Sequence, residues 1–331
     1  MVAAGSNIRL PLVPAAFFGI VLGMAGLANV WRAAHIAWGL PSMIGEALFA
    51  IAALVWLIVA TLYTLKWIVA PEEARAEAEH PVQCCFIGLG GVATLLIAQG
   101  ALPYSRAAAV ALFAIGTAFT LGFALWRTGL LWRGARAAAA STPVLYLPTV
   151  AGGFVAGTTA AALGWADWGQ LAFGAAFFSW LAIESVLLHR LYIADTLAPA
   201  LRPTLGIQLA PPAVGAICYL AVGSGVPDLV AHAMIGYALL QAILLLRLWP
   251  WIAEQPFGAA YWAFTFGATA LAGAAIKLAA HGDAGAMSVL APILFVGANL
   301  LVIAIAVGTI GLLVRRRLLP AALASQAAVV K

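Results

Sequence analysis

Glu184 is the most deeply placed acid in the apolar stretches of this chain, and two kinds of chemistry are open to it. It stands well inside the stretch 168–193, and Arg247 stands at a comparable depth in the stretch 229–251. Because an isolated charge in hydrocarbon is costly, such residues are usually paired. We therefore predict a structural ion pair between Glu184 and Arg247. The alternative is that Glu184 binds and releases a proton.

Phe266 is a candidate for a side chain that blocks the passage of ions. The segment 261–269 reads Tyr-Trp-Ala-Phe-Thr-Phe-Gly-Ala-Thr, and Phe266 is nine residues beyond Phe257. On a helix this places Phe266 about 14 Å from the start of its apolar stretch, near the bilayer midplane. A phenyl ring that projects into a narrow passage would exclude water and block ions, and a rotamer change would admit them. The alternative is a phenylalanine that is packed or faces lipid.

Enzyme chemistry is not indicated. The sequence contains no Walker loop, dinucleotide fingerprint, paired catalytic carboxylates or nucleophile elbow. Its three cysteines, Cys84, Cys85 and Cys218, have neither disulfide nor metal-ligand spacing, so we interpret them as buried small hydrophobic residues. We expect no enzymatic step, no metal and no cofactor.

The composition indicates an integral membrane protein. The 331 residues are 65% hydrophobic and 8% charged, and the mean hydropathy is +1.06. Soluble domains carry about 25% charged residues. The net charge of +5 comes from Lys and Arg residues scattered between apolar stretches, which is a topology signal and not a nucleic-acid-binding patch. We expect a single transmembrane domain that covers residues 1–331.

Ten apolar stretches of helix length follow one another along the chain. They are 14–35, 43–69, 81–100, 106–132, 143–164, 168–193, 204–223, 229–251, 257–280 and 286–314. Lipid offers no hydrogen-bond partner to the backbone and the stretches lack strand-like alternation, so they are predicted to be helices. An even number of spans puts both termini on the same side.

The distribution of positive charge predicts the orientation. Thirteen of the 16 Lys and Arg residues fall on the side that carries both termini, and Arg32, Arg106 and Lys277 fall on the other. Since positive residues concentrate in cytoplasmic connections, both termini should be cytoplasmic. Lys277 lies near the outer end of its stretch, and we expect its side chain to extend to the membrane interface. The acidic segment 72–79 is expected to be a solvated cytoplasmic connection.

Prolines mark a repeat of two stretches. Pro14, Pro81, Pro143, Pro203 and Pro256 stand at or just before the start of each odd-numbered stretch. Proline is tolerated in the first turn of a helix, so each marks a helix start. The pattern predicts five tandem helical hairpins that share one orientation and can surround a central axis.

Small and polar residues are concentrated in the odd-numbered stretches, and several even-numbered stretches are bulkier. We predict that the odd-numbered helices line a central pore, with prolines that kink two of them. The alternative is close helix packing through small residues. The predicted lining and kink residues are Gly19, Gly23, Gly90, Pro148, Gly152, Pro211, Pro212, Thr265, Gly267 and Thr269.

The chain also resembles the TehA family of bacterial tellurite-resistance and dicarboxylate-transporter-like membrane proteins, which are related to the plant guard-cell slow anion channels. The similar segments are 14–26 (PAAFFGIVLGMAG), 75–81 (RAEAEHP), 146–148 (YLP), 205–211 (LGIQLAP), 244–252 (LLLRLWPWI) and 262–267 (WAFTFG). The resemblance covers almost the whole chain. It implies trimeric assembly, a separate pore in each subunit lined by the odd helices, and a phenylalanine gate in the ninth helix, which is Phe266 here. Plant relatives carry a proline directly after that phenylalanine, where this chain has Gly267.

These observations predict a passive channel of the bacterial inner membrane for small inorganic or carboxylate anions. No ionisable side chain lies in the middle of an odd stretch, which argues against a proton relay, and the cytoplasmic rim is basic. The first alternative is a proton-coupled C4-dicarboxylate or tellurite exporter, which needs Glu184 or a histidine as a proton relay. The second is a structural or receptor-like membrane protein without conduction.

Overall fold

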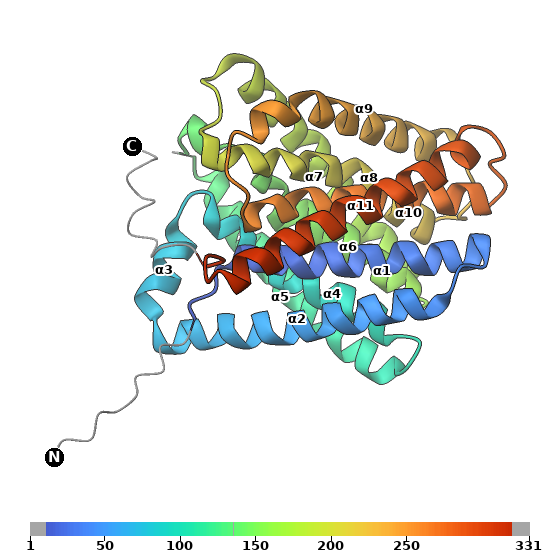
Figure 1. The fold of residues 1–331 in the computed structure, drawn as a ribbon, viewed down its shortest axis with the longest axis horizontal. Coiled ribbons are helices and arrows are strands. Elements are labelled where there is room, and N and C mark those ends of the chain that lie inside the picture. The colour runs from blue at the N-terminus through green and yellow to red at the C-terminus, as the bar shows by residue number, and fades with distance from the viewer. Residues whose placement is uncertain (1–10, 135, 320–331) are drawn as a thin grey trace.

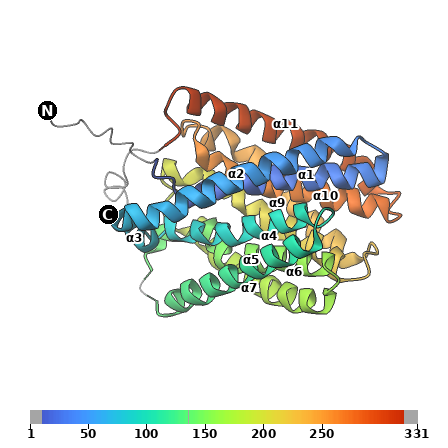
Figure 2. The ribbon, with the colours of Figure 1, turned by 90° about the horizontal axis from the view of Figure 1, so that it is seen from below.

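The structure is a computed structural model that describes residues 11–134 and 136–319, and the regular secondary structure in these ranges is entirely helical. Ten helices are long and apolar enough to cross a membrane, which confirms the predicted number. They run side by side along the long axis of the molecule (Figures 1 and 2). Arg9 and Lys331, which entered the charge count, lie outside the described residues.

The even-numbered spans are uninterrupted α-helices. They are α2 (Ser42–Val69), α5 (Arg106–Trp132), α7 (Ala166–Ile193), α9 (Leu229–Ile252) and α11 (Ala286–Val314). Their length and hydropathy allow each to cross a bilayer alone.

Each odd-numbered span begins with an irregular helical segment and continues as an α-helix. The pairs are η1 (Ala15–Phe17) with α1 (Phe18–Trp38), η2 (Gln83–Gly88) with α4 (Leu89–Ala101), η4 (Pro143–Tyr146) and η5 (Leu147–Ala151) with α6 (Gly152–Ala162), η6 (Pro199–Leu209) with α8 (Ala210–Val222), and η7 (Ala259–Phe264) with α10 (Thr265–Ala280). The segment η5 is a π-helical turn and the others are 3₁₀-helices. Two short helices, α3 (Pro71–Glu79) and η3 (Ala138–Ala140), lie outside the spans.

Of the three internal prolines, Pro148 lies inside the fifth span as expected, and Pro211 and Pro212 take a different place. Pro148 lies in the π-helical turn η5. Pro211 and Pro212 stand in the first turn of α8, because η6 ends at Leu209. The first turn of a helix does not need their missing N–H groups, so these two prolines start an α-helix and do not kink one. The seventh span begins at Pro199, five residues before the expected start at 204.

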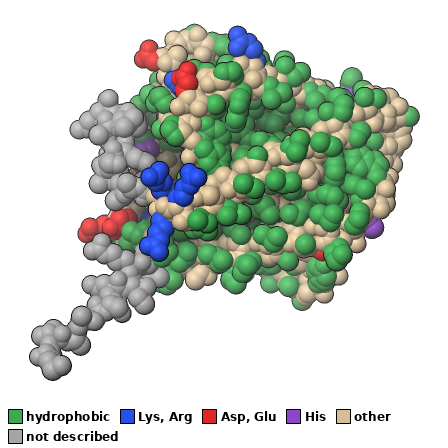
Figure 3. All heavy atoms as spheres, in the orientation of Figure 1, with side chains coloured by type: hydrophobic (Ala, Val, Ile, Leu, Met, Phe, Trp, Pro, Cys, Tyr) green, Lys and Arg blue, Asp and Glu red, His purple; other side chains and the backbone are tan. Residues whose placement is uncertain are grey.

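The odd-numbered spans form an inner ring. In the most apolar part of each, between 61% and 78% of the residues are buried, compared with 22% to 33% in the even-numbered spans. Going round the ring, α1 packs on α4, α4 on α6, α6 on α8, α8 on α10, and α10 on α1. Each even-numbered helix packs against the odd-numbered helix before it and exposes a hydrophobic outer face, as Figure 3 shows for one side.

One end of the bundle, which we call the α3 end, is held by a buried ion pair. Lys66 at the end of α2 and Glu77 of α3 lie 2.6 Å apart, and their side chains are only 2% and 1% exposed. The second carboxylate oxygen of Glu77 accepts a hydrogen bond from the backbone N–H of Ala15 at 2.8 Å. The expectation that this acidic segment is solvated was therefore wrong for Glu77, because its carboxylate joins the first two spans.

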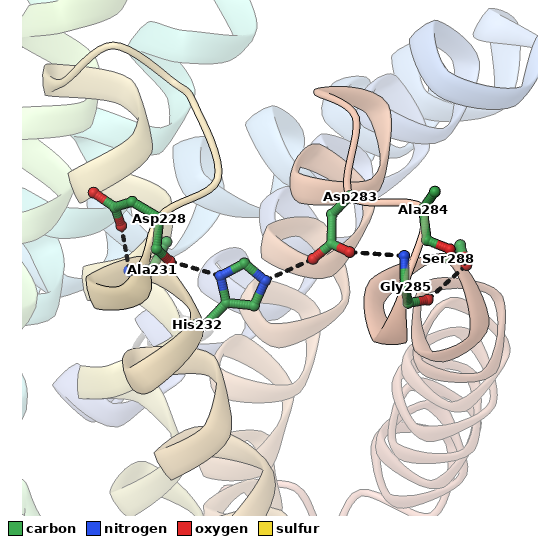
Figure 4. A network of polar contacts seen from close by, with 7 residues as sticks. All are labelled: Asp228, Ala231, His232, Asp283, Ala284, Gly285 and Ser288. Atoms are coloured by element: carbon green, nitrogen blue, oxygen red, sulfur yellow. Dashed lines mark hydrogen bonds and ion pairs between the residues drawn. The ribbon is translucent and has the colours of Figure 1, made fainter.

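The opposite end, which we call the far end, is held by polar contacts near the surface. Arg32 of α1 forms a salt bridge with Glu46 of α2 at 2.6 Å and donates to the carbonyl of Gln99 at 3.1 Å. His232 of α9 lies between Asp228 and Asp283, and Figure 4 shows this chain of contacts. Its Nδ1 is 2.6 Å from the carbonyl of Asp228 and its Nε2 is 2.6 Å from the carboxylate of Asp283. Two such acceptors suit an imidazolium, which donates from both nitrogens.

The contact between His232 and Asp283 predicts that stability depends on pH in one direction. The hydrogen bond from His232, and then that from the backbone N–H of Gly285, lower the pKa of the Asp283 carboxyl. A lowered pKa contributes stability above the carboxyl's ordinary pKa, and this contribution is lost as the pH falls through the lowered value. Asp283→Asn should therefore lower the melting temperature of the solubilised protein at pH 6, and this difference should shrink as the pH falls through the lowered pKa. Because the pair is partly exposed, the loss should be below about 1 kcal/mol.

Glu79→Gln is the matched control, since it removes an exposed carboxylate that makes no hydrogen bond or ion pair with the described residues. Equal effects of the two substitutions at pH 6 would contradict the assigned role of Asp283.

Candidate functional site

A cavity of about 640 Å³ lies at the α3 end of the inner ring, and we call it the inner cavity. All five odd-numbered spans contribute to its wall. One lining residue from each is Gly19, Leu89, Val150, Pro211 and Phe266. The wall is mostly apolar, and exposed Asp195 and Arg317 lie at its rim.

The irregular starts of the odd spans shape this cavity. In a 3₁₀-helix, side chains three residues apart lie in one row. Along η6, every third residue from Ala198 to Ala210 borders the cavity, through Leu201, Thr204 and Ile207. An α-helix would turn this row away from the cavity, so the 3₁₀ geometry keeps one segment facing it over its whole length.

Phe266, the second residue of α10, forms part of the inner cavity wall. Its side chain is partly buried and packs against the hydrophobic core. The ring lies beside α1, where a β-carbon on Gly26 would stand 3.4 Å from ring atom Cδ2. The ring therefore faces the interior of the bundle and not lipid.

A second cavity, of about 180 Å³, lies at the far end among α1, α8 and α10, and we call it the outer cavity. Lys277 and His281 line it. Lys277 was expected to extend to the membrane interface, and it borders this cavity at the far end, so that expectation stays a prediction. Lys277 follows Phe266 by eleven residues, which on an α-helix places it on the same face and about 16 Å further along. Phe266 therefore lies between the two cavities along α10.

Only part of the predicted lining set borders the inner cavity. Gly19 and Pro211 do, beside the predicted gate residue Phe266. The residues outside its lining are Gly23, Gly90, Pro148, Gly152, Pro212, Thr265, Gly267 and Thr269. Several of these occupy close helix contacts, which was the alternative interpretation.

One of these contacts joins α1 to α10 through two glycines of α1. A β-carbon on Gly23 would stand 2.3 Å from Thr265 Oγ1, and one on Gly26 would stand 2.3 Å from Thr269 Oγ1. Real β-carbons do not approach so closely, so both glycines are required by packing. Both threonines are buried and donate to carbonyls of their own helix segment, Thr265 to Trp262 at 2.8 Å and Thr269 to Thr265 at 2.9 Å. Their hydroxyl protons are not available to an ion.

Gly267 and Gly152 also allow close helix approach. A β-carbon on Gly267 would stand 2.9 Å from the backbone nitrogen of Ala210, and one on Gly152 would stand 2.0 Å from Thr120 Cγ2. Gly267 thus sets how closely the segment with Phe266 approaches the start of α8.

The predicted ion pair between Glu184 and Arg247 is wrong. Arg247 is exposed on α9 and no salt bridge joins it to Glu184, whose side chain is buried. The carboxylate of Glu184 instead accepts hydrogen bonds from Tyr146 Oη at 2.5 Å, Trp180 Nε1 at 2.9 Å, Gln208 Nε2 at 2.7 Å and Tyr237 Oη at 2.5 Å. Neutral donors thus satisfy this buried carboxylate, while the long Arg247 side chain can reach the membrane surface.

Two polar residues of the inner cavity were not singled out from the sequence, His80 and Arg190. His80 Nδ1 accepts hydrogen bonds from the backbone N–H groups of Val82 and Gln83, both at 3.1 Å. Burial lowers the pKa of His80, against a smaller opposing effect of Glu77. Both facts favour a neutral imidazole that shapes the start of η2. Arg190 lies in the last turn of α7. In the sequence it looks like the other basic residues at span ends, so no pattern distinguished it.

Comparisons with a family model and with individual known proteins agree with one another. Residues 13–310 match the family model SLAC1, described as voltage-dependent anion channel. The chain is 37% identical over 279 residues to the tellurite resistance protein TehA homolog of Haemophilus influenzae, and the match covers 84% of each chain. It is 24% identical to the S-type anion channel SLAH2 and 25% identical to the guard cell S-type anion channel SLAC1, both of Arabidopsis thaliana. These matches cover 57% and 50% of the plant proteins, so the chain spans about half their length.

The contact between α1 and α10 predicts the effect of adding one methyl group. Gly26→Ala should lower the free energy of unfolding by about 1–3 kcal/mol, because Thr269 and α10 must shift to admit the new β-carbon. Thr269→Ala in the same chain should recover part of the loss, since it removes the oxygen that the methyl group meets. Thermal melting of the solubilised protein measures both effects.

Gly122→Ala is the control, because Gly122 lies inside α5 and a β-carbon there would meet no atom within 4 Å. This substitution should be neutral or slightly stabilising. A loss for Gly26→Ala no larger than that for Gly122→Ala would show that the contact is loose.

Proposed function

The chain belongs to the SLAC1 family of anion channels, and we propose that it conducts small anions passively through each protomer, past a gate formed by Phe266. It is a multi-pass membrane protein of a family of channels and transporters. The observation that carries the gating proposal is the place of Phe266, which borders the inner cavity and precedes Lys277 of the outer cavity on the same face of α10.

The proposed route runs along the axis of the inner ring. We propose that the odd-numbered helices line it from the inner cavity, past Phe266, to the outer cavity. The ring closes within one chain through the contact of α10 with α1, so the route needs no second subunit. By resemblance to the TehA family we further propose a homotrimer with a separate route in each protomer.

The charges along this route support an anion as the permeating ion. Arg190 and Arg317 border the inner cavity, and Lys277 borders the outer one. Among the described residues, a single acid, Asp195, borders the inner cavity and none borders the outer one. The remaining walls are largely apolar. Positive groups at both ends would raise the local concentration of anions without an acidic ring that favours cations.

The surroundings of Glu184 support passive conduction over proton coupling. A proton relay needs access to the permeation route. Glu184 is 7% exposed, does not border either cavity, and is surrounded by hydrogen-bond donors. The second candidate function is a coupled dicarboxylate or tellurite exporter, and the name of the bacterial relative at 37% identity, a tellurite resistance protein, favours tellurite.

We propose that the α3 end faces the cytoplasm and that the membrane is the bacterial inner membrane. Lys66, Arg75, Arg136, Arg202 and other basic residues lie at span ends or connections on this side, whereas Arg32, Arg106 and Lys277 are at the far end. This asymmetry follows the rule for cytoplasmic connections. The proposal places both termini in the cytoplasm, although the two ends of the chain are outside the described residues.

Removing the phenyl ring of Phe266 should open the route. Phe266→Ala frees on the order of 100 Å³, room for about three waters by their share of liquid volume. Chloride current through the reconstituted protein should rise at least about tenfold and depend linearly on voltage, because a wetted constriction conducts passively. Recordings from planar bilayers at equal chloride on both sides measure this.

Phe178→Ala is the matched control, since the Phe178 side chain is 72% exposed on the outer face of α7. It should leave the current unchanged. Saturable uptake that requires a proton gradient would support the exporter instead, and silence of both Phe266→Ala and the parent would contradict conduction altogether.

A further inference from the structure

We propose that Arg190 is an anion-binding residue of the inner cavity and that it takes organic carboxylates. This inference rests on the proposed function, because it names the class of anion that occupies the inner side of the proposed route. Arg190 stands in the last turn of α7, an even-numbered helix, yet it borders the cavity enclosed by the odd-numbered spans.

Arg190 is buried without a partner among the described residues. Its side chain is 7% exposed, and its Nε is fully enclosed with no hydrogen-bond acceptor. Among the described residues, no Asp or Glu oxygen lies within 4 Å of its nitrogens and no acceptor is hydrogen-bonded to its guanidinium. Arg32 and Lys66 differ in this respect, because each is a partly or fully buried cation that pairs with a carboxylate. A buried charge that no described residue pairs with leaves its donors open to an acceptor that enters the cavity.

The guanidinium and the cavity wall together define the ligand. A guanidinium presents parallel N–H donors, which match the two oxygens of a carboxylate better than they match a spherical halide. The apolar side chains of Leu147, Leu201, Ile207 and Phe266 also border the cavity. Apolar walls with one convergent charged group suit a small organic anion, whose hydrocarbon body packs on the wall.

Two hydroxyl groups of the cavity already donate elsewhere, and its other two charged residues are exposed. The hydroxyl of Tyr146 donates to Glu184, and that of Thr204 donates to the carbonyl of Leu201. Arg317 and Asp195 are exposed at the rim, where water screens their charges. The buried cation that faces the cavity is therefore Arg190.

The position of Arg190 predicts that binding depends on the side of the membrane. The residue lies on the inner side of Phe266, and a benzoate ion can reach it from the α3 end through the cavity. In Phe266→Ala protein, benzoate added on that side should compete with chloride and reduce the current. Benzoate added at the far end should act at a concentration at least about tenfold higher, because the narrow part of the route intervenes.

Three substitutions test the assignment in the Phe266→Ala background. Arg190→Gln should raise the benzoate concentration for half-block by about 10- to 100-fold, the range expected for losing a charged hydrogen-bond pair. Arg190→Lys keeps the charge but loses the paired donors, so an intermediate increase of several-fold is expected. Arg317→Gln removes the same charge from the rim of the same cavity and should change the value by less than about twofold.

A binding measurement on the intact solubilised protein separates this proposal from the proposed function. Benzoate should raise the melting temperature of the parent and of Arg317→Gln in a concentration-dependent way, and should not raise that of Arg190→Gln. If Phe266→Ala carries no current, conduction is contradicted while this melting comparison still decides the role of Arg190. Equal stabilisation of the parent and Arg190→Gln by benzoate would overturn the proposal.

A purely structural role for Arg190 makes a different prediction. It requires that Arg190→Gln melt well below the parent in the absence of benzoate. We expect the variant to melt no lower, because the substitution removes a buried charge that pairs with no group of the described residues. If Arg190→Gln does not fold, that result supports the structural role. The deciding measurement is then benzoate binding by folded Arg190→Lys, which the proposal requires to be weaker than binding by the parent.

Discussion

The close approach of α1 and α10 is the constraint on which the rest of the structure depends. Gly23 and Gly26 let the backbone of α1 lie directly against Thr265 and Thr269, and this contact closes the ring of odd-numbered spans. It also fixes the axial position of Phe266, which is held between α1 and the inner cavity. Small residues are therefore needed here for geometry more than for a polar wall, as is common where membrane helices pack without a hydrophobic driving force.

A second constraint comes from the irregular starts of the odd-numbered spans. Regular α-helices packed as closely as α1 and α10 would fill the interior to both ends. The irregular segments lie at one end of the odd-numbered spans only. In the 3₁₀-helix η6 every third side chain points toward the axis, and the π-helical turn η5 changes which side chains do so. The result is a wide cavity at the α3 end and a small one at the far end. The even-numbered helices, which face outward, have no such segments.

The sequence predicted the ten spans because hydrophobic length is a local property that each helix carries by itself. Phe266 was also singled out, from its depth and its neighbours. The partners of Glu184 were not predicted, because depth along two helices says nothing about which faces meet, and Arg247 proved to point outward. The burial of Thr265 and Thr269 was missed for the same reason. Arg190 could not be distinguished from the other basic residues at span ends, since its isolation depends on what surrounds it in three dimensions.

The carboxylate of Glu77 has a consequence for biogenesis. It holds the backbone N–H of Ala15 and the ammonium group of Lys66, which belong to different spans, and its own helix follows both of them in the chain. This three-way junction can therefore close only after the first hairpin is inserted and its two ends have met at the same membrane surface. A ribosome-bound chain that has emerged as far as Glu79 already contains every group of the junction, so the first hairpin can be secured before the remaining eight spans are synthesised.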